Sequence, residues 1–435
     1  MLPKNVQPNV FAWAWKLADF VLSFQSFMEL RSRWCSRKVS FSSSFSGIGA
    51  LEVSLECLQT ALNGCGVPSH FHSVSACEIS PSCRSILRKR NAHLHIIPDI
   101  MDNFLGEIPK YEGCYHTLKQ KMLSLRVCES CPCCSGERPQ ALVDVSGSPC
   151  QPHSRCGSRL KENDSRIVFL LAWMCLHKHL RTPVLIHENV VGFEERLLTE
   201  VLVEYHCFQL VLEPADARFN LISRKRVYHI LIRRDIQVLQ SPVDVFRRLA
   251  ALFRAQSPQD IDWTWLPKLV CNEDLLQEEN ACRRRKRLPT VTVVSPDWSI
   301  LLTEKQQGYL AAAESKWLEK HGVTAKFDSR CVVFNLGDNL QERSLPRPGP
   351  LPCFKHNKGI LWVPRLSRWL THRERAAAMG FPVFPNLARE AGCALSCLDI
   401  TSSQVGNSFH VANCGMVVVS TLLCLQHPLP PDSCV

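Results

Sequence analysis

The 435-residue sequence has no long uninterrupted apolar run. An apolar and aromatic stretch near its start, residues 9–29, is broken by Lys16, Asp19 and Gln25. A membrane span needs about 20 consecutive apolar residues, so this stretch predicts an amphipathic helix packed on a domain. The sequence also lacks a recognisable signal peptide and any internal repeat. Its 23 cysteines are scattered, and we therefore expect reduced thiols inside a cell.

Acidic residues are in the minority. The chain has 51 Lys and Arg against 40 Asp and Glu, a net charge of +11, and a sequence pI of about 8.8. That surplus favours a polyanionic partner. A hydrophobic content of 46% with 21% charged residues describes a globular protein. A chain of 49.3 kDa has room for two domains, or for one domain with a large insertion.

The stretch over residues 141–157 carries the first chemical candidate. Its apolar start, Ala141 to Val145, predicts a buried strand of a parallel sheet, and small residues then break the strand. Pro149 stiffens the backbone directly before Cys150. The carboxyl ends of strands in open α/β sheets are where ligands bind, so a thiol there suits a nucleophile. Most cysteines are small buried hydrophobes, however, and Cys150 alone carries little weight.

Three earlier strand ends carry ligand-binding signals. Residues 39–58 run from a strand through a turn with Gly47 and Gly49 into an amphipathic helix, where backbone N–H groups can approach a ligand. Glu78 ends the next predicted strand and Asp99 the one after it. Nucleotide-binding sheets grip ribose hydroxyls with an acidic residue in this position. Each signal alone also describes an ordinary turn or a solvated carboxylate.

A strand–helix–strand pattern follows Cys150. Residues 164–179 have a helical apolar pattern, and residues 183–187 predict a buried strand that ends in Glu188. One right-handed crossover between parallel strands would place Glu188 beside Cys150 at the same edge of the sheet.

The pattern changes after the next strands. Arg224 and Arg226 point to one face at the start of a further predicted strand, where a solvated basic strand end is the plain interpretation. From about Arg234 the α/β rhythm stops. The basic run over residues 283–287 fits a phosphate contact, a nuclear import signal and a solvated loop equally well. Order returns near residue 365, and an apolar helix over residues 409–425 should pack back on the first domain.

A predicted loop insertion over residues 111–140 is rich in cysteine. A Cys-x-x-Cys-x-Cys-Cys run is able to bind zinc, but no second pair stands at the spacing typical of zinc fingers. We therefore predict a reduced surface loop and assign no metal ligand. The cysteines of this run are Cys128, Cys131, Cys133 and Cys134.

Taken in chain order, these stretches resemble the cytosine-5 DNA methyltransferase family. The resemblance covers about residues 40–232 and 360–425, and the segment between them occupies the family's variable target-recognition position. It is carried by Phe45, Gly47 and Gly49 of the cofactor loop, Glu78 at the ribose, Asp99 at the adenine, Pro149 and Cys150 of the nucleophile motif, Glu188 of the second catalytic motif, the paired Arg224 and Arg226, and Asn407 of the closing motif.

The resemblance implies an α/β fold, a Rossmann-like S-adenosyl-methionine-dependent methyltransferase sheet with a smaller variable target-recognition domain. The implied organisation is an N-terminal helical extension over 1–38, a catalytic cofactor-binding domain over 39–234, a target-recognition domain over 235–364, and a return to the catalytic domain with a closing helix over 365–428.

The implied activity is methyl transfer from S-adenosyl-methionine to carbon 5 of a flipped-out cytosine in DNA, through a covalent adduct at Cys150. Glu188, Arg226 and Arg224 would complete the catalytic set. A nuclear location and no membrane partner go with this expectation.

Two alternatives remain open. A transfer-RNA cytosine-5 methyltransferase is favoured by the Pro-Cys-Gln-Pro-x-Ser-Arg stretch and faintly by Cys353-Phe354. A DNA-binding homologue that has lost activity is suggested by departures from the family pattern. These departures are His153 in place of a usual Phe, residues 219–222 in place of Gly-x-Pro-Gln, and Ala50 in place of a common third glycine.

Overall fold

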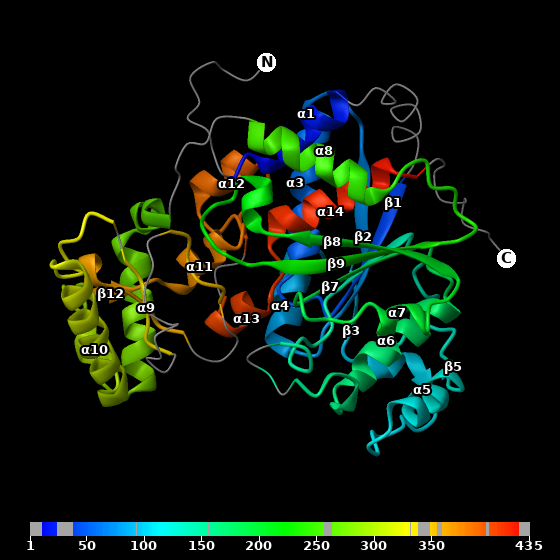
Figure 1. Cartoon of the computed structure of the whole chain (residues 1–435), viewed down its shortest axis with the longest axis horizontal. Helices are drawn as coiled ribbons and strands as arrows, with labels where there is room; N and C mark the ends of the chain where they lie inside the picture. Colours follow the sequence, from blue (N-terminus) through cyan, green and yellow to red (C-terminus); the bar gives the residue numbers. More distant parts are fainter. Residues whose placement is uncertain are drawn as a thin grey trace.

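The computed structural model describes residues 11–23, 38–92, 94–154, 157, 159–255, 263–330, 332–337, 349–354, 359–396 and 400–425. Figure 1 shows two lobes, a larger one built on a central sheet and a smaller one around α9 and α10.

A seven-stranded sheet in the order β3-β2-β1-β6-β7-β9-β8 organises the larger lobe. The pairs among β3, β2, β1, β6 and β7 are parallel, and β9 is antiparallel to both β7 and β8. The strand order reverses between β1 and β6, which is where open α/β sheets bind ligands. The strands are β1 (Lys38–Ser44), β2 (His70–Cys77), β3 (His95–Ile97), β6 (Val143–Ser146), β7 (Val184–Asn189), β8 (Tyr205–Leu212) and β9 (Arg226–Arg233).

Helices cover both faces of this sheet, so the lobe has three layers (Figure 1). One face carries α1 (Trp13–Ser23), α3 (Ala50–Gly64), α8 (Pro242–Ala255) and α14 (Val411–Leu423), and the other carries α5 (Tyr115–Leu123), α6 (Ile167–His179) and α7 (Arg196–Thr199). The predicted packing of the closing helix on the first domain is confirmed, because α14 lies against α3. So is the predicted packing of the N-terminal helix for its described part, α1, which contacts α3 and α14. None of the helices described is long and apolar enough to cross a membrane.

The serine-rich strand β1 can lie at the centre of the sheet because a buried carboxylate accepts hydrogen bonds from its serine hydroxyls. Asp144 of β6 accepts hydrogen bonds from the hydroxyls of Ser42 and Ser44, at 2.7 and 3.1 Å. The indole N–H of Trp173 on α6 donates to its other oxygen at 2.8 Å. A buried polar group is tolerated where its hydrogen bonds are made. This network joins β1, β6 and α6, and it holds the two strands whose ends form the ligand edge.

The smaller lobe has its own core around four tryptophans. Trp298, Trp317, Trp362 and Trp369 are buried together, and the rings of Trp298 and Trp369 lie 4.6 Å apart. The lobe consists of α9 (Asn272–Arg285), α10 (Glu304–His321) and a small antiparallel sheet of β10 (Phe334–Asn335), β11 (Leu361–Val363) and β12 (Arg368–Trp369).

The smaller lobe's core begins at α9, whereas α8 packs on α14 in the larger lobe. The boundaries of the target-recognition domain, predicted near residues 235 and 365, stay predictions. The remaining elements are α4 (Pro81–Arg90), β4 (Phe104–Leu105), β5 (Arg126–Val127), α11 (His372–Ala378), α12 (Pro385–Ala391), α13 (Ser402–Asn407), and the short 3₁₀ helices η1 (Ile100–Asn103), η2 (Lys161–Asn163), η3 (Pro214–Ala217), η4 (Trp263–Leu269), η5 (Ser299–Leu301) and η7 (Pro364–Leu366).

Candidate active site

Cys150 and Glu188 follow neighbouring strands to one edge of the sheet. Ser146 of β6 pairs with His187 of β7, so the loop that carries Cys150 leaves the sheet beside Glu188. Glu188 in turn pairs with β9 two residues from Arg226. The charges of Glu188, Arg226 and Arg224 all act on the Cys150 thiol. The strand order thus brings together the four residues predicted to form the catalytic set.

Hydrogen bonds and packing fix the loop that holds Cys150. The hydroxyl of Ser148 lies 2.8 Å from His187 Nε2, and Asn189 donates its amide N–H to the same hydroxyl at 3.2 Å. Gly147 packs against the ring of Phe409, where an added Cβ would lie 2.4 Å from the ring. The loop is therefore tied both to β7 and to the segment just before α14.

The Cys150 thiol is partly exposed and is protonated at neutral pH. Burial raises its pKa above the usual value, and the negative charge of Glu188 adds to that effect. Arg226 and Arg224 oppose the rise and only partly offset it. A thiolate, the nucleophilic form, therefore requires removal of the proton at the time of attack.

The two paired arginines have different partners. Arg226 Nε lies 3.2 Å from Glu188 Oε1 in a largely buried ion pair. Arg224 instead donates to the backbone carbonyls of Gly406 and Ser408, at 3.3 and 2.7 Å. Arg226 therefore orients the carboxylate, whereas Arg224 ties the edge of β9 to the end of α13.

Cys353 is a residue of this site that we did not assign from the sequence. Its sulfur lies 3.5 Å from Nη1 of Arg224 and 3.5 Å from Nη2 of Arg226. Burial would raise the pKa of this thiol, but the two arginines outweigh burial and lower it. Leu351 brings the segment here by exchanging backbone hydrogen bonds with Leu221 and Ser223. The only sequence signal was the faint Cys353-Phe354 resemblance.

The departures from the family pattern are packing residues. His153 is buried with its ring 4.7 Å from that of Phe193, and burial lowers its pKa, so it acts as a neutral aromatic ring. Phe219 and Leu221 are fully buried in the main core. Ile222, which stands where the family pattern has Gln, is buried in the same core, whereas Cys150, Glu188, Arg224 and Arg226 are all present.

The predicted cofactor residues line the neighbouring strand ends. Phe45, Gly47 and Gly49 have positive φ angles of 58°, 57° and 82°, and Gly49 is the N-cap of α3. The buried Glu78 accepts hydrogen bonds from the backbone N–H groups of Gly47 at 2.7 Å and of Ser80 at 2.8 Å. This arrangement holds a carboxylate against the glycine turn, at the start of a helix.

The glycine turn is tight at Gly49, where an added Cβ would lie 3.0 Å from the Leu87 side chain, and open at Gly47. Asp99, at the end of β3, caps η1 by accepting from the N–H of Met101 at 3.0 Å. Asn407 is exposed at the end of α13, the helix that reaches α4 through a 3.0 Å hydrogen bond from Gln404 to Ser82. A close-fitting glycine turn, two carboxylates and a helix N-terminus suit a nucleoside with a charged tail.

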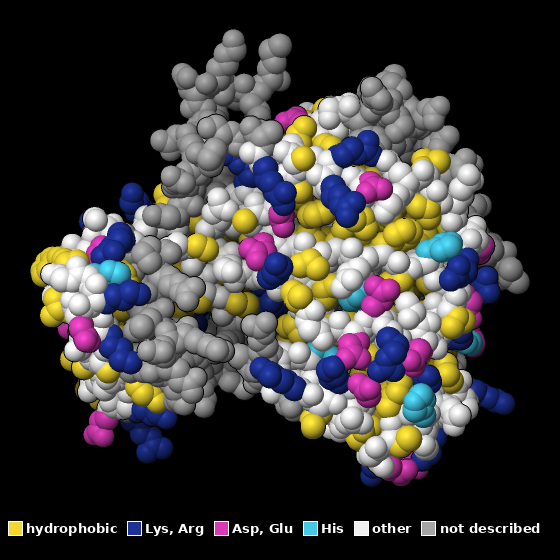
Figure 2. Space-filling model, in the orientation of Figure 1, with side chains coloured by type: hydrophobic (Ala, Val, Ile, Leu, Met, Phe, Trp, Pro, Cys, Tyr) yellow, Lys and Arg dark blue, Asp and Glu magenta, His cyan; other side chains and the backbone are white. Residues whose placement is uncertain are grey.

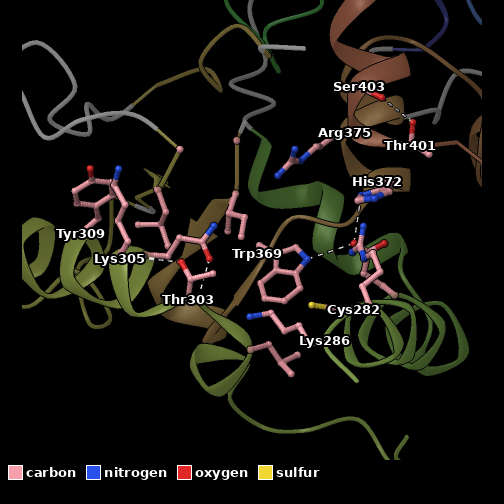
Figure 3. A pocket seen from close by; sticks show the side chains of 18 residues that line it. Cys282, Lys286, Thr303, Lys305, Tyr309, Trp369, His372, Arg375, Thr401 and Ser403 are labelled. Carbon is pink, nitrogen blue, oxygen red and sulfur yellow. Dashed lines mark hydrogen bonds and ion pairs between the residues drawn. The ribbon is translucent and has the colours of Figure 1, made fainter. Parts of the chain in front are cut away.

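A cavity of about 720 Å³ lies between the smaller lobe and the helices α11 and α13 (Figure 3). Its lining includes the cationic side chains of Arg285, Lys286, Lys305 and Arg375. Glu278, also in the lining, accepts from the Trp369 indole N–H at 3.3 Å. The cavity is separate from the strand ends at Cys150 and is mainly basic.

The fold and the residues at the strand ends around Cys150 define a class of protein. This class is the α/β methyltransferases with a mostly parallel seven-stranded sheet. The chain belongs to the C-5 cytosine-specific DNA methylase family, whose family model matches residues 141–414. This confirms the family resemblance and the predicted fold class. A nucleic acid is accordingly its class of substrate, and S-adenosyl-methionine the methyl donor that the family implies.

Three solved structures are similar to this chain at low sequence identity. The Dnmt2 methyltransferase of S. pombe is 19% identical, with a TM-score of 0.44, and the match covers 89% of this chain and 98% of that one. A protein described as a prophage-encoded DNA modification methyltransferase (E. coli) is 14% identical, with a TM-score of 0.49 and 89% and 99% coverage. The Entamoeba histolytica methyltransferase EhMeth is 14% identical, with a TM-score of 0.44 and 89% and 98% coverage. A search of curated proteins finds no match.

Proposed function

We propose that the protein is a DNA cytosine-5 methyltransferase that works through a covalent adduct at Cys150. The observation that carries this proposal is that the Cys150 thiol lies close to an ion-paired carboxylate at the carboxyl ends of β6 and β7. These strand ends lie next to the point where the strand order of the sheet reverses. Glu188 and Arg226 are 3.2 Å apart there, and both act on the Cys150 thiol.

The thiol supplies what the reaction needs. Carbon 5 of cytosine is a poor nucleophile, and it becomes reactive when sulfur adds to carbon 6 and shifts the electron pair of the 5,6 double bond to carbon 5. Cys150 would lose its proton to solvent water as the sulfur–carbon bond forms. S-adenosyl-methionine, when bound, would supply the methyl group and leave as S-adenosyl-homocysteine. Loss of the carbon 5 proton to water and departure of the thiolate would then restore the ring.

Glu188 and Arg226 would hold the target base. The carboxyl of Glu188 would form hydrogen bonds with N3 and the exocyclic amine of the cytosine. These bonds would stabilise the charge that develops on the cytosine ring. Arg226 would donate to the ring carbonyl. Arg224 would act as a positioning residue, since its guanidinium is already bound to Gly406 and Ser408. A stacked base does not fit this arrangement, so the cytosine would be flipped out of the helix.

The donor would lie across the first three strand ends. Glu78 would bind the ribose hydroxyls and Asp99 the adenine, with Phe45 against the adenine ring. Gly47 and Gly49 would let the methionine part approach the backbone. Pro149 and Asn407 would close the pocket towards Cys150.

The preference for DNA rests on the family, and the net charge supports a nucleic acid of either kind. The chain carries a net charge of +11, and its family model describes a DNA methylase. Figure 2 shows basic side chains interspersed with acidic ones over the described residues in view. The basic cavity beside the smaller lobe is therefore the better candidate for a backbone phosphate contact, with Lys286 at the end of α9 and Lys305 of α10 in its lining. A nuclear location is part of this proposal.

Transfer RNA is the second candidate substrate. It is favoured by the position of Cys353, whose sulfur contacts both paired arginines. The Cys353-Phe354 pair was the feature of the variable segment that resembled the transfer-RNA branch.

Methyl transfer from labelled S-adenosyl-methionine to duplex DNA and to total transfer RNA, with Cys150→Ala as the matched control, tests the proposal. We expect label on carbon 5 of cytosine in the DNA with the wild-type protein and no label with the variant. Label on transfer RNA alone would overturn the choice of DNA. Binding of DNA without label on either substrate would favour the inactive DNA-binding homologue.

A further inference from the structure

The cysteine-rich loop meets a histidine from a different part of the chain. His95, the first residue of β3, lies 36 positions before Cys131 and faces the loop that follows β5, at the lower right of Figure 1. The His95 ring nitrogen and the sulfurs of Cys131, Cys133 and Cys134 all lie within 4.8 Å of one another. Three soft sulfur ligands and one imidazole are a donor set typical of zinc.

The separations match a tetrahedral centre. Ligands about 2.3 Å (sulfur) and about 2.0 Å (nitrogen) from zinc lie about 3.8 Å apart for two sulfurs and about 3.5 Å apart for sulfur and nitrogen. Here His95 Nδ1 lies 3.4 Å from the Cys131 sulfur and 3.7 Å from those of Cys133 and Cys134. The sulfurs of Cys131 and Cys133 lie 3.2 Å apart and would move slightly apart around an ion.

The backbone of the loop already has the shape of a metal-binding turn. The N–H of Cys131 donates to the carbonyl of Gly136 at 2.8 Å, and the N–H of Ser135 donates back to the carbonyl of Cys131 at 2.8 Å. Ser135 has a φ of 56°, the left-handed conformation that such a tight turn requires. These bonds present three thiols to the same side without help from an ion.

Arg138 supports the loop from below and supplies positive charge. It is buried, and it donates to the backbone carbonyls of Cys128 and Ser130 at 2.7 and 3.2 Å. A third bond, 2.6 Å long, reaches the side-chain oxygen of Asn103. The Arg138 charge interacts with Cys131, which offsets the net negative charge of a centre with three thiolates.

We propose that His95 Nδ1 and the sulfurs of Cys131, Cys133 and Cys134 form a structural zinc site. All four positions are taken by protein, as in structural zinc sites, where no position is left open for water or substrate. The sequence interpretation assigned no metal here because it looked for a second cysteine pair, whereas the fourth ligand is a histidine on a strand. Cys128, which belongs to the same cysteine run, is not a ligand.

The site would fasten the outer edge of the sheet. His95 begins β3, and the chain after β3 leads to η1, whose Asn103 accepts hydrogen bonds from the loop. Zinc would join the loop to the start of the β3–η1 segment at His95, and the hydrogen bonds to Asn103 join the loop to its end. Loss of zinc should loosen residues 95–103 and 126–138 together and leave β6 and β7 unaffected.

Metal analysis of the full-length protein, purified under reducing conditions, tests the proposal. We expect close to one equivalent of zinc in the wild type, trace zinc in Cys131→Ser and His95→Ala, and full zinc in the matched control Cys128→Ser. A wild-type protein that holds no zinc with its thiols reduced would overturn the proposal. Equal loss in Cys128→Ser would overturn the ligand assignment.

A wild-type experiment keeps the test independent of folding defects in the variants. Cobalt added to chelator-treated protein should give the intense visible absorption of a tetrahedral cobalt–thiolate centre. Zinc should protect the exposed Cys133 and Cys134 from alkylation, with the exposed Cys114 alkylated at the same rate with and without zinc. Equal protection of Cys114, or no protection of Cys133 and Cys134, would contradict the site.

Discussion

The negative charge of Glu188 and the positive charge of Arg226 act in opposite senses on the pKa of the Cys150 thiol. Neutralising Glu188 and neutralising Arg226 should therefore shift that pKa in opposite directions. Glu188 raises the pKa, whereas Arg226 lowers it. Glu188→Gln removes the negative charge with little change of shape, and the thiol pKa should fall. Arg226→Gln removes the positive charge, and the thiol pKa should rise.

The size of the shift follows from proximity. A charge within a few ångströms moves a pKa by about one to three units, and we take about one unit because Glu188 and Arg226 partly cancel each other. At neutral pH one unit changes the thiolate fraction about tenfold. A thiolate of lower pKa is also less nucleophilic, by about threefold per unit. The alkylation rate of Cys150 should therefore rise about threefold in Glu188→Gln and fall about threefold in Arg226→Gln.

Peptide-resolved mass spectrometry of iodoacetamide labelling from about pH 6 to about pH 10 would measure both pKa and rate. Cys114 is exposed and serves as the internal reference, with the same rate in every variant. Because the wild-type thiol pKa lies above its usual value, the Cys150 rate, and kcat/KM for methylation with it, should rise with pH above neutrality. Shifts of equal sign in the two variants, or no shift, would refute this account of the site.

Three further predictions concern stability and nucleic-acid binding. Gly147→Ala should clash with the Phe409 ring, lower the free energy of unfolding by about 1–3 kcal/mol, and reduce activity. Gly308→Ala, at a helix position with open space, should raise the free energy of unfolding by about 0.5–1 kcal/mol. Thermal denaturation of the two variants tests both expectations. Asp144→Ala should cost about 3–5 kcal/mol in urea unfolding because three buried donors lose their acceptor, and a cost below about 1 kcal/mol would contradict the role of this network. Lys286→Glu should weaken nucleic-acid binding and reduce the slope of log Kd against log salt concentration by about one. Lys320→Glu, outside the cavity, should change neither the affinity nor the slope. Equal effects of the two variants, measured in binding titrations at several salt concentrations, would show that the cavity does not bind the nucleic acid.

Local and periodic features of the fold were predictable from the sequence. The buried run that became β7, with Glu188 near its end, has the length and the preceding Pro183 expected of a central strand. The capping box of Thr371 and Glu374 at the start of α11 is predictable from a spacing of three residues. Such features depend on neighbours in the chain, so a pattern suffices to find them.

Long-range partners were not predictable in the same way. Cys353 reaches Arg224 across 129 residues, through backbone bonds of Leu351 that leave no side-chain pattern. His95 faces the cysteine loop because β3 lies at the sheet edge, and nothing in the spacing of the cysteines points to it. Ser42 is buried in a central strand only because Asp144 accepts its hydroxyl, and that partner stands 102 residues later.

Covalent trapping on nucleic acid containing 5-fluorocytosine tests the central claim most directly. The fluorine at carbon 5 cannot leave as a proton does, so the sulfur–carbon 6 adduct should persist in the presence of S-adenosyl-methionine. We expect intact mass spectrometry to show one adduct on the wild-type chain, mapped to Cys150 and absent in Cys150→Ala. A folded wild-type protein that binds the trapping substrate without an adduct, or an adduct mapped to Cys353, would contradict the account.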